Sequence, residues 1–70
     1  MEHVLSKTIL ITKVIELIAE HYKVSIKEAR NMLYESGVIN LIEDDDTGLY
    51  GESPLYVFSL FEKTRKRNKF

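Results

Sequence analysis

The sequence predicts an all-α domain, a small bundle of three main helices plus a short fourth segment. Apolar residues recur at helical spacing along much of the chain, and two segments begin with residues that cap helix N-termini. The 70 residues are 44% apolar and 30% charged, too apolar for a disordered chain and too charged for a membrane span. A winged helix-turn-helix of the α+β class is the alternative, in which two short apolar segments pair as strands.

The first predicted helix runs from about Leu5 to Tyr22. Contact with one neighbouring helix needs an apolar arc of about 100°. Here the arc is wider, roughly 160° at helical spacing, so we expect this helix to pack against two neighbours, or against one neighbour and a second subunit. Ile9 falls on the polar side and is expected to be an exposed apolar residue. The arc consists of Leu10, Ile11, Val14, Ile15, Leu17, Ile18 and Tyr22.

The second predicted helix has signals at both ends. Ser25 and Glu28 form a capping box, in which the serine hydroxyl accepts a hydrogen bond from the Glu28 amide and the glutamate reaches back. Gly37 suits the left-handed residue that follows a helix, after which Val38 can fold back on the apolar stripe. That stripe consists of Ile26, Ala29, Met32 and Leu33.

The second half of the chain begins with segments too short to show a period. Residues 38–42 are predicted as a short helix, with a strand as the alternative. The acidic residues 43–46 are predicted as a loop, because negative charge is unfavourable at a helix C-terminus. Ser53 and Pro54 suit the N-cap and first residue of a helix. The apolar residues 55–61 that follow are predicted as helix, and a strand stays open.

Charge is divided unevenly along the chain. Residues 1–62 hold five basic and eleven acidic side chains, a balance of −6, whereas residues 63–70 hold five basic and no acidic ones, a balance of +5. We therefore predict a single helical domain over residues 1–62 and a basic C-terminal tail over residues 63–70. The acidic body disfavours broad contact with DNA, and the tail is a candidate site for an anionic partner.

The sequence does not support catalysis, and we expect that the protein is not an enzyme. It contains no cysteine, which excludes disulfides, thiolate zinc sites and cysteine nucleophiles. The acidic run lacks the ligand spacing of a calcium-binding loop, and no glycine-rich phosphate loop is present, so no metal and no cofactor are expected. Since no signal peptide or membrane span is evident, we expect a cytoplasmic protein without membrane contact.

Residues 18–29 have offsets that resemble those of bacterial helix-turn-helix regulators. Ala19 and Ala29 would let two helices cross closely, and the second helix would enter the major groove of DNA. Against this hypothesis, Lys23 stands at the turn position that usually holds glycine, and the second helix also carries two acidic residues. The candidate nucleic-acid contacts are Lys27, Arg30 and Asn31, together with Lys63, Arg65, Lys66 and Arg67 of the basic tail.

The small size of the chain favours association with a protein partner or with a second copy. A domain of this length buries a small core, and an interface is a natural source of further burial. The wide arc of the first helix and the aromatic residues expected at the surface point to the same conclusion. The candidate interface residues are Ile9, Leu10, Val14, Leu17, His21, Tyr34, Tyr56 and Leu60.

The order of features resembles a family of short bacterial helical proteins, functionally uncharacterised, whose genes sometimes lie beside predicted toxin genes. The resemblance covers about residues 8–62: a long apolar helix, Ser-Ile-Lys-Glu-Ala at 25–29, Ser-Gly-Val-Ile at 36–39, a glycine turn and an aromatic-rich last segment. It implies a binding role, such as neutralising a partner protein, and transfers no catalytic residue. We therefore expect a small intracellular protein-interaction module that forms a homodimer or binds another protein, with a helix-turn-helix DNA-binding regulator as the alternative.

Overall fold

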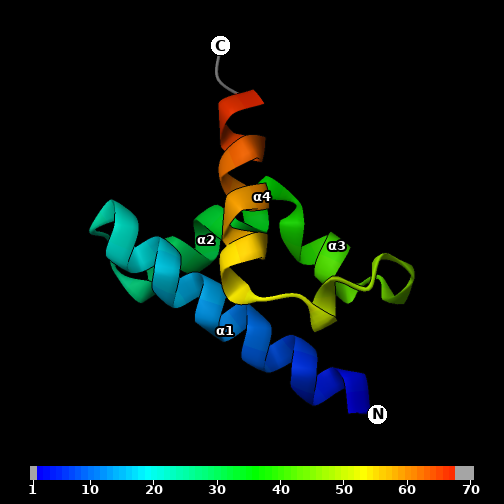
Figure 1. Cartoon of the computed structure of the whole chain (residues 1–70). Coiled ribbons are helices and arrows are strands. Elements are labelled where there is room, and N and C mark those ends of the chain that lie inside the picture. Colours follow the sequence, from blue (N-terminus) through cyan, green and yellow to red (C-terminus); the bar gives the residue numbers. More distant parts are fainter. Residues whose placement is uncertain (1, 68–70) are drawn as a thin grey trace.

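The computed structural model describes residues 2–67 and, within them, the side chains of residues 6–44 and 46–65. Figure 1 shows α1 crossing the base of the molecule, with α4 standing across it and α2 and α3 on opposite sides of α4 in this view. The elements in chain order are α1 (Glu2–Tyr22), α2 (Ile26–Ser36), α3 (Val38–Glu43), the 3₁₀ turns η1 (Asp45–Thr47) and η2 (Leu49–Gly51), and α4 (Pro54–Arg67).

The predicted all-α class is confirmed, with three long helices and the short α3. Both segments that were open to a strand, residues 38–42 and 55–61, are helical. Over residues 2–67 no strand is present, so the winged, α+β alternative is wrong. The physical reason is that a helix satisfies its own backbone hydrogen bonds, whereas strands with two apolar faces need more sheet than this chain can supply.

A tight turn joins α1 to α2. Lys23 follows α1 in the left-handed conformation, with φ of 59°. The Val24 amide then donates a hydrogen bond to the carbonyl oxygen of Ala19 at 3.0 Å. The Glu28 amide donates to Ser25 Oγ at 3.1 Å, which confirms the predicted N-cap of α2. The turn reverses the chain, so that α2 packs on α1.

Gly37 ends α2 and leads directly into α3. Its φ is 85°, the left-handed conformation that the sequence predicts at this position, and its amide donates to the Tyr34 carbonyl oxygen at 3.3 Å. Val38, the next residue, is fully buried among the core side chains, as predicted. Gly37 therefore ends α2 and sets the direction in which α3 begins.

The acidic run is only partly the predicted loop. Glu43 is the last residue of α3, and Asp45–Thr47 form a 3₁₀ turn. The Thr47 hydroxyl lies 2.6 Å from the carbonyl oxygen of Leu41 and 2.9 Å from that of Asp44. This hydroxyl helps to satisfy the carbonyls that a helix C-terminus leaves unpaired, so α3 can end within the acidic run.

The last helix begins where the sequence predicts and continues further. The Tyr56 amide donates to Ser53 Oγ at 3.2 Å, and Pro54 is the first helical residue. Residues 63–67, predicted as part of the basic C-terminal tail, belong to α4. Lysine and arginine are good helix formers, and their positive charge is favourable near a helix C-terminus. The rest of the predicted tail, residues 68–70, lies outside the described residues.

One hydrophobic core joins all four helices. Helix α1 contacts α2, α3, α4 and η2, which confirms that its wide apolar arc packs against more than one neighbour. Within the described side chains, no buried nitrogen or oxygen atom lacks a hydrogen-bond partner. The largest fully buried side chains are Val14, Ile18, Leu33, Val38, Ile42, Val57 and Phe61.

Candidate interaction surface

A groove of about 390 Å³ runs between α1 and α2. We call it the α1–α2 groove and define it by seven lining residues. Helix α1 supplies one wall, and α2 supplies the other. The lining residues are Ile11, Thr12, Ile15 and Glu16 on the α1 wall and Ile26, Arg30 and Tyr34 on the α2 wall.

The spacing of the α2 wall explains how this groove forms. Ile26, Arg30 and Tyr34 follow one another at intervals of four residues, which places them on a single face of the helix. Because the Ser25 cap fixes the start of α2, Ile26 stands in the first turn and the stripe runs along most of the helix. The buried Ala29 and Leu33 hold the neighbouring face of α2 against the core.

The groove exposes large apolar side chains. Ile26 is 52% exposed and Tyr34 is 60% exposed, whereas Ile15, on the α1 wall, is buried. A second molecule can cover the exposed apolar side chains of such a groove. Contact is favourable because it removes apolar surface from water.

Two opposite charges stand on opposite walls of the groove. Glu16 on α1 and Arg30 on α2 are both exposed. Neither side chain forms an ion pair with a residue that the structure describes. Both charges are therefore available to a partner that enters the groove.

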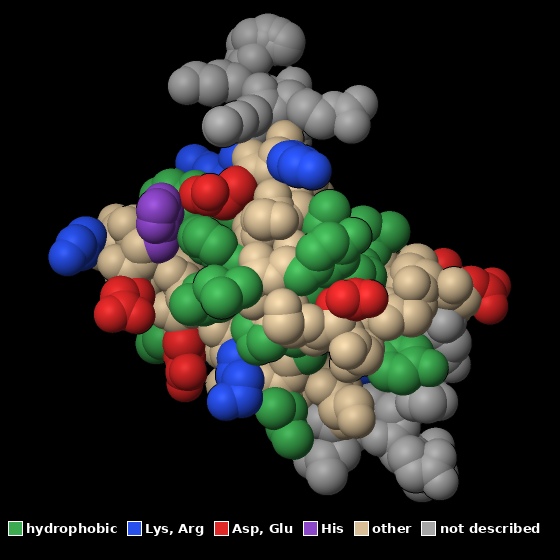
Figure 2. All heavy atoms as spheres, viewed as in Figure 1, with side chains coloured by type: hydrophobic (Ala, Val, Ile, Leu, Met, Phe, Trp, Pro, Cys, Tyr) green, Lys and Arg blue, Asp and Glu red, His purple; other side chains and the backbone are tan. Residues whose placement is uncertain are grey.

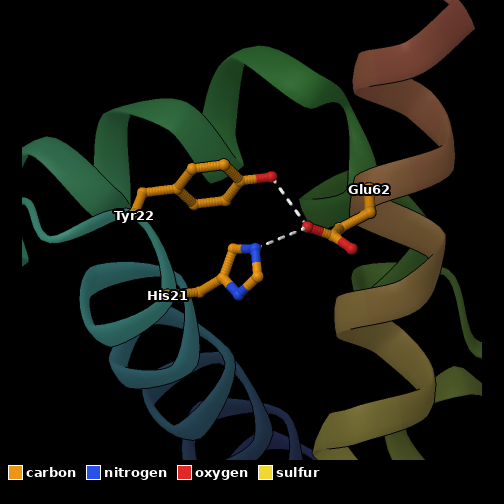
Figure 3. A network of polar contacts seen from close by, with 3 residues as sticks. All are labelled: His21, Tyr22 and Glu62. Carbon is orange, nitrogen blue, oxygen red and sulfur yellow. Dashed lines mark hydrogen bonds and ion pairs between the residues drawn. The ribbon is translucent and has the colours of Figure 1, made fainter.

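A separate polar cluster joins the end of α1 to α4 (Figure 3). The Tyr22 hydroxyl donates to Glu62 Oε2 at 2.8 Å, and His21 Nε2 lies 3.3 Å from the same oxygen. The guanidinium of Arg65 stands 5.2 Å from the centre of the Tyr22 ring. Burial, and then the neighbouring Glu62 carboxylate, raises the pKa of Tyr22 above its ordinary value. These side chains bind one another, so the cluster links the end of α1 to α4.

The structure distributes the candidate interface residues over several surfaces. Tyr34 lies in the groove, Ile9, His21 and Tyr56 are exposed outside its lining, and Leu17 and Leu60 are partly buried. The prediction that Leu10 and Val14 belong to an interface is wrong. Their side chains are 4% and 0% exposed, so neither offers surface to a partner. The reason is that α2, α3 and α4 of the same chain fill the apolar arc of α1, which leaves these two side chains in the core.

The candidate nucleic-acid contacts are divided between two helices. Lys27, Arg30 and Asn31 are exposed on α2, and Lys63 and Arg65 are exposed on α4. Lys66 and Arg67 belong to α4, and their side chains lie outside the described ones. Among the described side chains in Figure 2, basic and acidic ones are interspersed, so they form no continuous basic surface on this face.

Sequence reasoning missed five of the seven groove residues, all but Arg30 and Tyr34. Ile26 was assigned to the apolar stripe of α2, and it is half exposed because it is the first residue of that helix. The four-residue spacing of Ile26, Arg30 and Tyr34 was the signal that could have found the α2 wall.

These features define a small all-α domain with an apolar groove between its first two helices. No family model, curated protein or solved structure matches the chain. The resemblance to the family of short bacterial helical proteins therefore stays a prediction.

None of the helices that the structure describes has the length and apolar character needed to cross a membrane. The same part of the chain contains no cluster of three or more histidine, cysteine, aspartate or glutamate side chains suited to holding a metal ion.

Proposed function

We propose that this chain is a protein-interaction module that binds a protein partner through the α1–α2 groove. The observation that carries the proposal is the pair of exposed apolar side chains, Ile26 and Tyr34, at the edge of an apolar groove. Covering apolar surface gains about 25 cal/mol per Å². Tyrosine and arginine, which both stand on the α2 wall, are the residue types that most often dominate binding at protein interfaces.

Affinity capture with groove variants tests the proposal. We would immobilise the chain and capture proteins from a lysate of the source cells, with and without nuclease. We expect Tyr34→Ala to abolish capture of the partner, because the variant removes the largest exposed side chain of the groove. The matched control is Leu55→Ala, since Leu55 is 67% exposed on α4, outside the groove lining.

The control variant and the nuclease step decide the outcome. Capture that survives nuclease and Leu55→Ala but fails with Tyr34→Ala supports the proposal. Capture that Tyr34→Ala leaves unchanged would contradict it, and capture that nuclease abolishes would favour a nucleic-acid partner.

The second candidate function is DNA binding through a helix-turn-helix formed by α1 and α2. The specific observation that favours it is Lys23, which adopts the left-handed turn conformation that glycine usually supplies in such motifs. The exposed Lys27, Arg30 and Asn31 on α2 are also suited to phosphate and base contacts. Glu28 is exposed on the same helix and would repel phosphate, so we place this function second.

A further inference from the structure

We infer that the α1–α2 groove binds a second copy of the same chain, as a two-fold dimer in which Glu16 of each copy pairs with Arg30 of the other. This inference rests on the proposed function and names the partner. It is carried by two charges of opposite sign on opposite walls of one apolar groove, neither of which forms an ion pair with a described residue.

Two-fold symmetry makes such a surface complementary to itself. In a two-fold interface, if residue i of one copy contacts residue j of the other, then j of the first also contacts i of the second. An axis that runs along the groove lays the α1 wall of each copy on the α2 wall of the other. Glu16 then faces Arg30 of the second copy, and the same pair forms again on the other side of the axis.

The positions of the charges favour this arrangement over a second two-fold arrangement, in which like helices lie on one another. A two-fold axis that runs across the helices would lay α2 on α2 and α1 on α1. Arg30 stands midway between Ile26 and Tyr34, so the two arginines would then meet near the axis. Like charges opposite one another cost free energy at an interface, whereas opposite charges fix the register. The arrangement with α1 on α2 avoids that repulsion.

The apolar side chains fit the same arrangement. When α2 of one copy lies on α1 of the other, its exposed Ile26 and Tyr34 face the wall that carries Ile11 and Ile15. The interface then has an apolar centre and a reciprocal pair of charges. For an 8.2 kDa chain without cysteine, this burial adds to the apolar surface that its small core removes from water.

Charge reversal tests the pairing. Sedimentation equilibrium of the full chain, from micromolar to millimolar concentration, measures the dissociation constant of the dimer. Glu16→Arg and Arg30→Glu should each raise that constant about tenfold or more, because each variant brings only like charges together. The double variant Glu16→Arg/Arg30→Glu should restore dimerisation, since it exchanges the two charges and keeps the pair.

Mixing the two single variants gives the sharpest result. One then carries arginine at both positions and the other carries glutamate at both, so we expect them to form a heterodimer although neither forms a homodimer. Matched controls are Glu35→Arg and Lys63→Glu, which make the same charge changes at exposed positions outside the groove lining. Circular dichroism of each variant checks that the helices remain folded.

Three outcomes would overturn the inference: a chain that stays monomeric at millimolar concentration, a dimer that the single reversals leave unchanged, or single variants that do not associate with each other. The proposed function is tested separately, because the capture experiment detects any protein that binds through Tyr34, whereas sedimentation measures self-association alone. A monomeric chain that still captures a partner through Tyr34 refutes the dimer alone.

Discussion

Tyr22 connects the last turn of α1 to α4 through its hydroxyl group. The hydrogen bond to Glu62 is 2.8 Å long, and the Tyr22 ring also contacts the ring of Phe61 edge-on, with centres 6.3 Å apart. Because a carboxylate accepts this bond, it is stronger than a bond between neutral groups. The ionised phenolate could not donate it and would stand beside a negative charge, so folding favours the protonated tyrosine.

Tyr22→Phe should therefore reduce stability in a way that depends on pH. At neutral pH we expect the free energy of unfolding to fall by about 1.5 kcal/mol, the lower end of the range for a hydrogen bond to a charged group, because this bond is only partly buried. The raised pKa of Tyr22 stabilises the native chain in full below the ordinary tyrosine pKa of 10.0, and this stabilisation is lost as pH rises through the folded-state pKa. Urea denaturation at neutral and alkaline pH measures both effects.

Tyr34→Phe is the matched control for this measurement. Tyr34 is exposed, and its hydroxyl makes no hydrogen bond with a described residue, so the change should leave the free energy of unfolding nearly unaltered. If the native chain and Tyr22→Phe lost stability equally above pH 10.0, the linkage assigned to Tyr22 would be wrong.

At the scale of helices, the boundaries follow from a few local residues. The serine caps of α2 and α4 and the left-handed Gly37 were predictable, because each acts through hydrogen bonds or backbone angles of adjacent residues. The end of α4 was not predicted. A run of basic residues shows no apolar period, yet it continues a helix at little cost when the preceding turns are packed on the core.

Gly37→Ala should destabilise the chain because φ at this position is 85°. A Cβ atom added there would meet nothing within 4 Å, so backbone strain alone sets the cost. A left-handed L-residue costs roughly 1–2 kcal/mol, and we expect a loss of that size in the free energy of unfolding by urea denaturation.

Gly51→Ala provides the comparison for Gly37→Ala. Gly51 is equally open, but its φ lies outside the left-handed range, so the change should shift stability by less than about 0.5 kcal/mol. Equal losses at the two glycines would show that the left-handed conformation does not determine the junction of α2 and α3.

At the scale of the whole molecule, the sequence predicted the helices but not the surface between them. A helical wheel shows which face of one helix is apolar, and it does not show which faces adjoin after folding. Leu10 and Val14 were therefore placed at an interface although they lie in the core. The groove arises from residues of two helices, at positions 11–16 and 26–34, and their proximity depends on the turn at Lys23.

The distribution of charge over the chain disfavours binding to DNA. Residues 1–62 carry a charge balance of −6, and the exposed Glu28 and Glu35 share α2 with the basic candidates. We therefore expect the chain not to bind duplex DNA at physiological ionic strength, because contact with phosphates supplies most of the affinity. Fluorescence anisotropy with labelled duplexes over a series of salt concentrations measures this. Affinity that persists at about 0.15 M salt and is weakened by Lys27→Ala, a change outside the groove lining, would reverse the order of the two proposed functions.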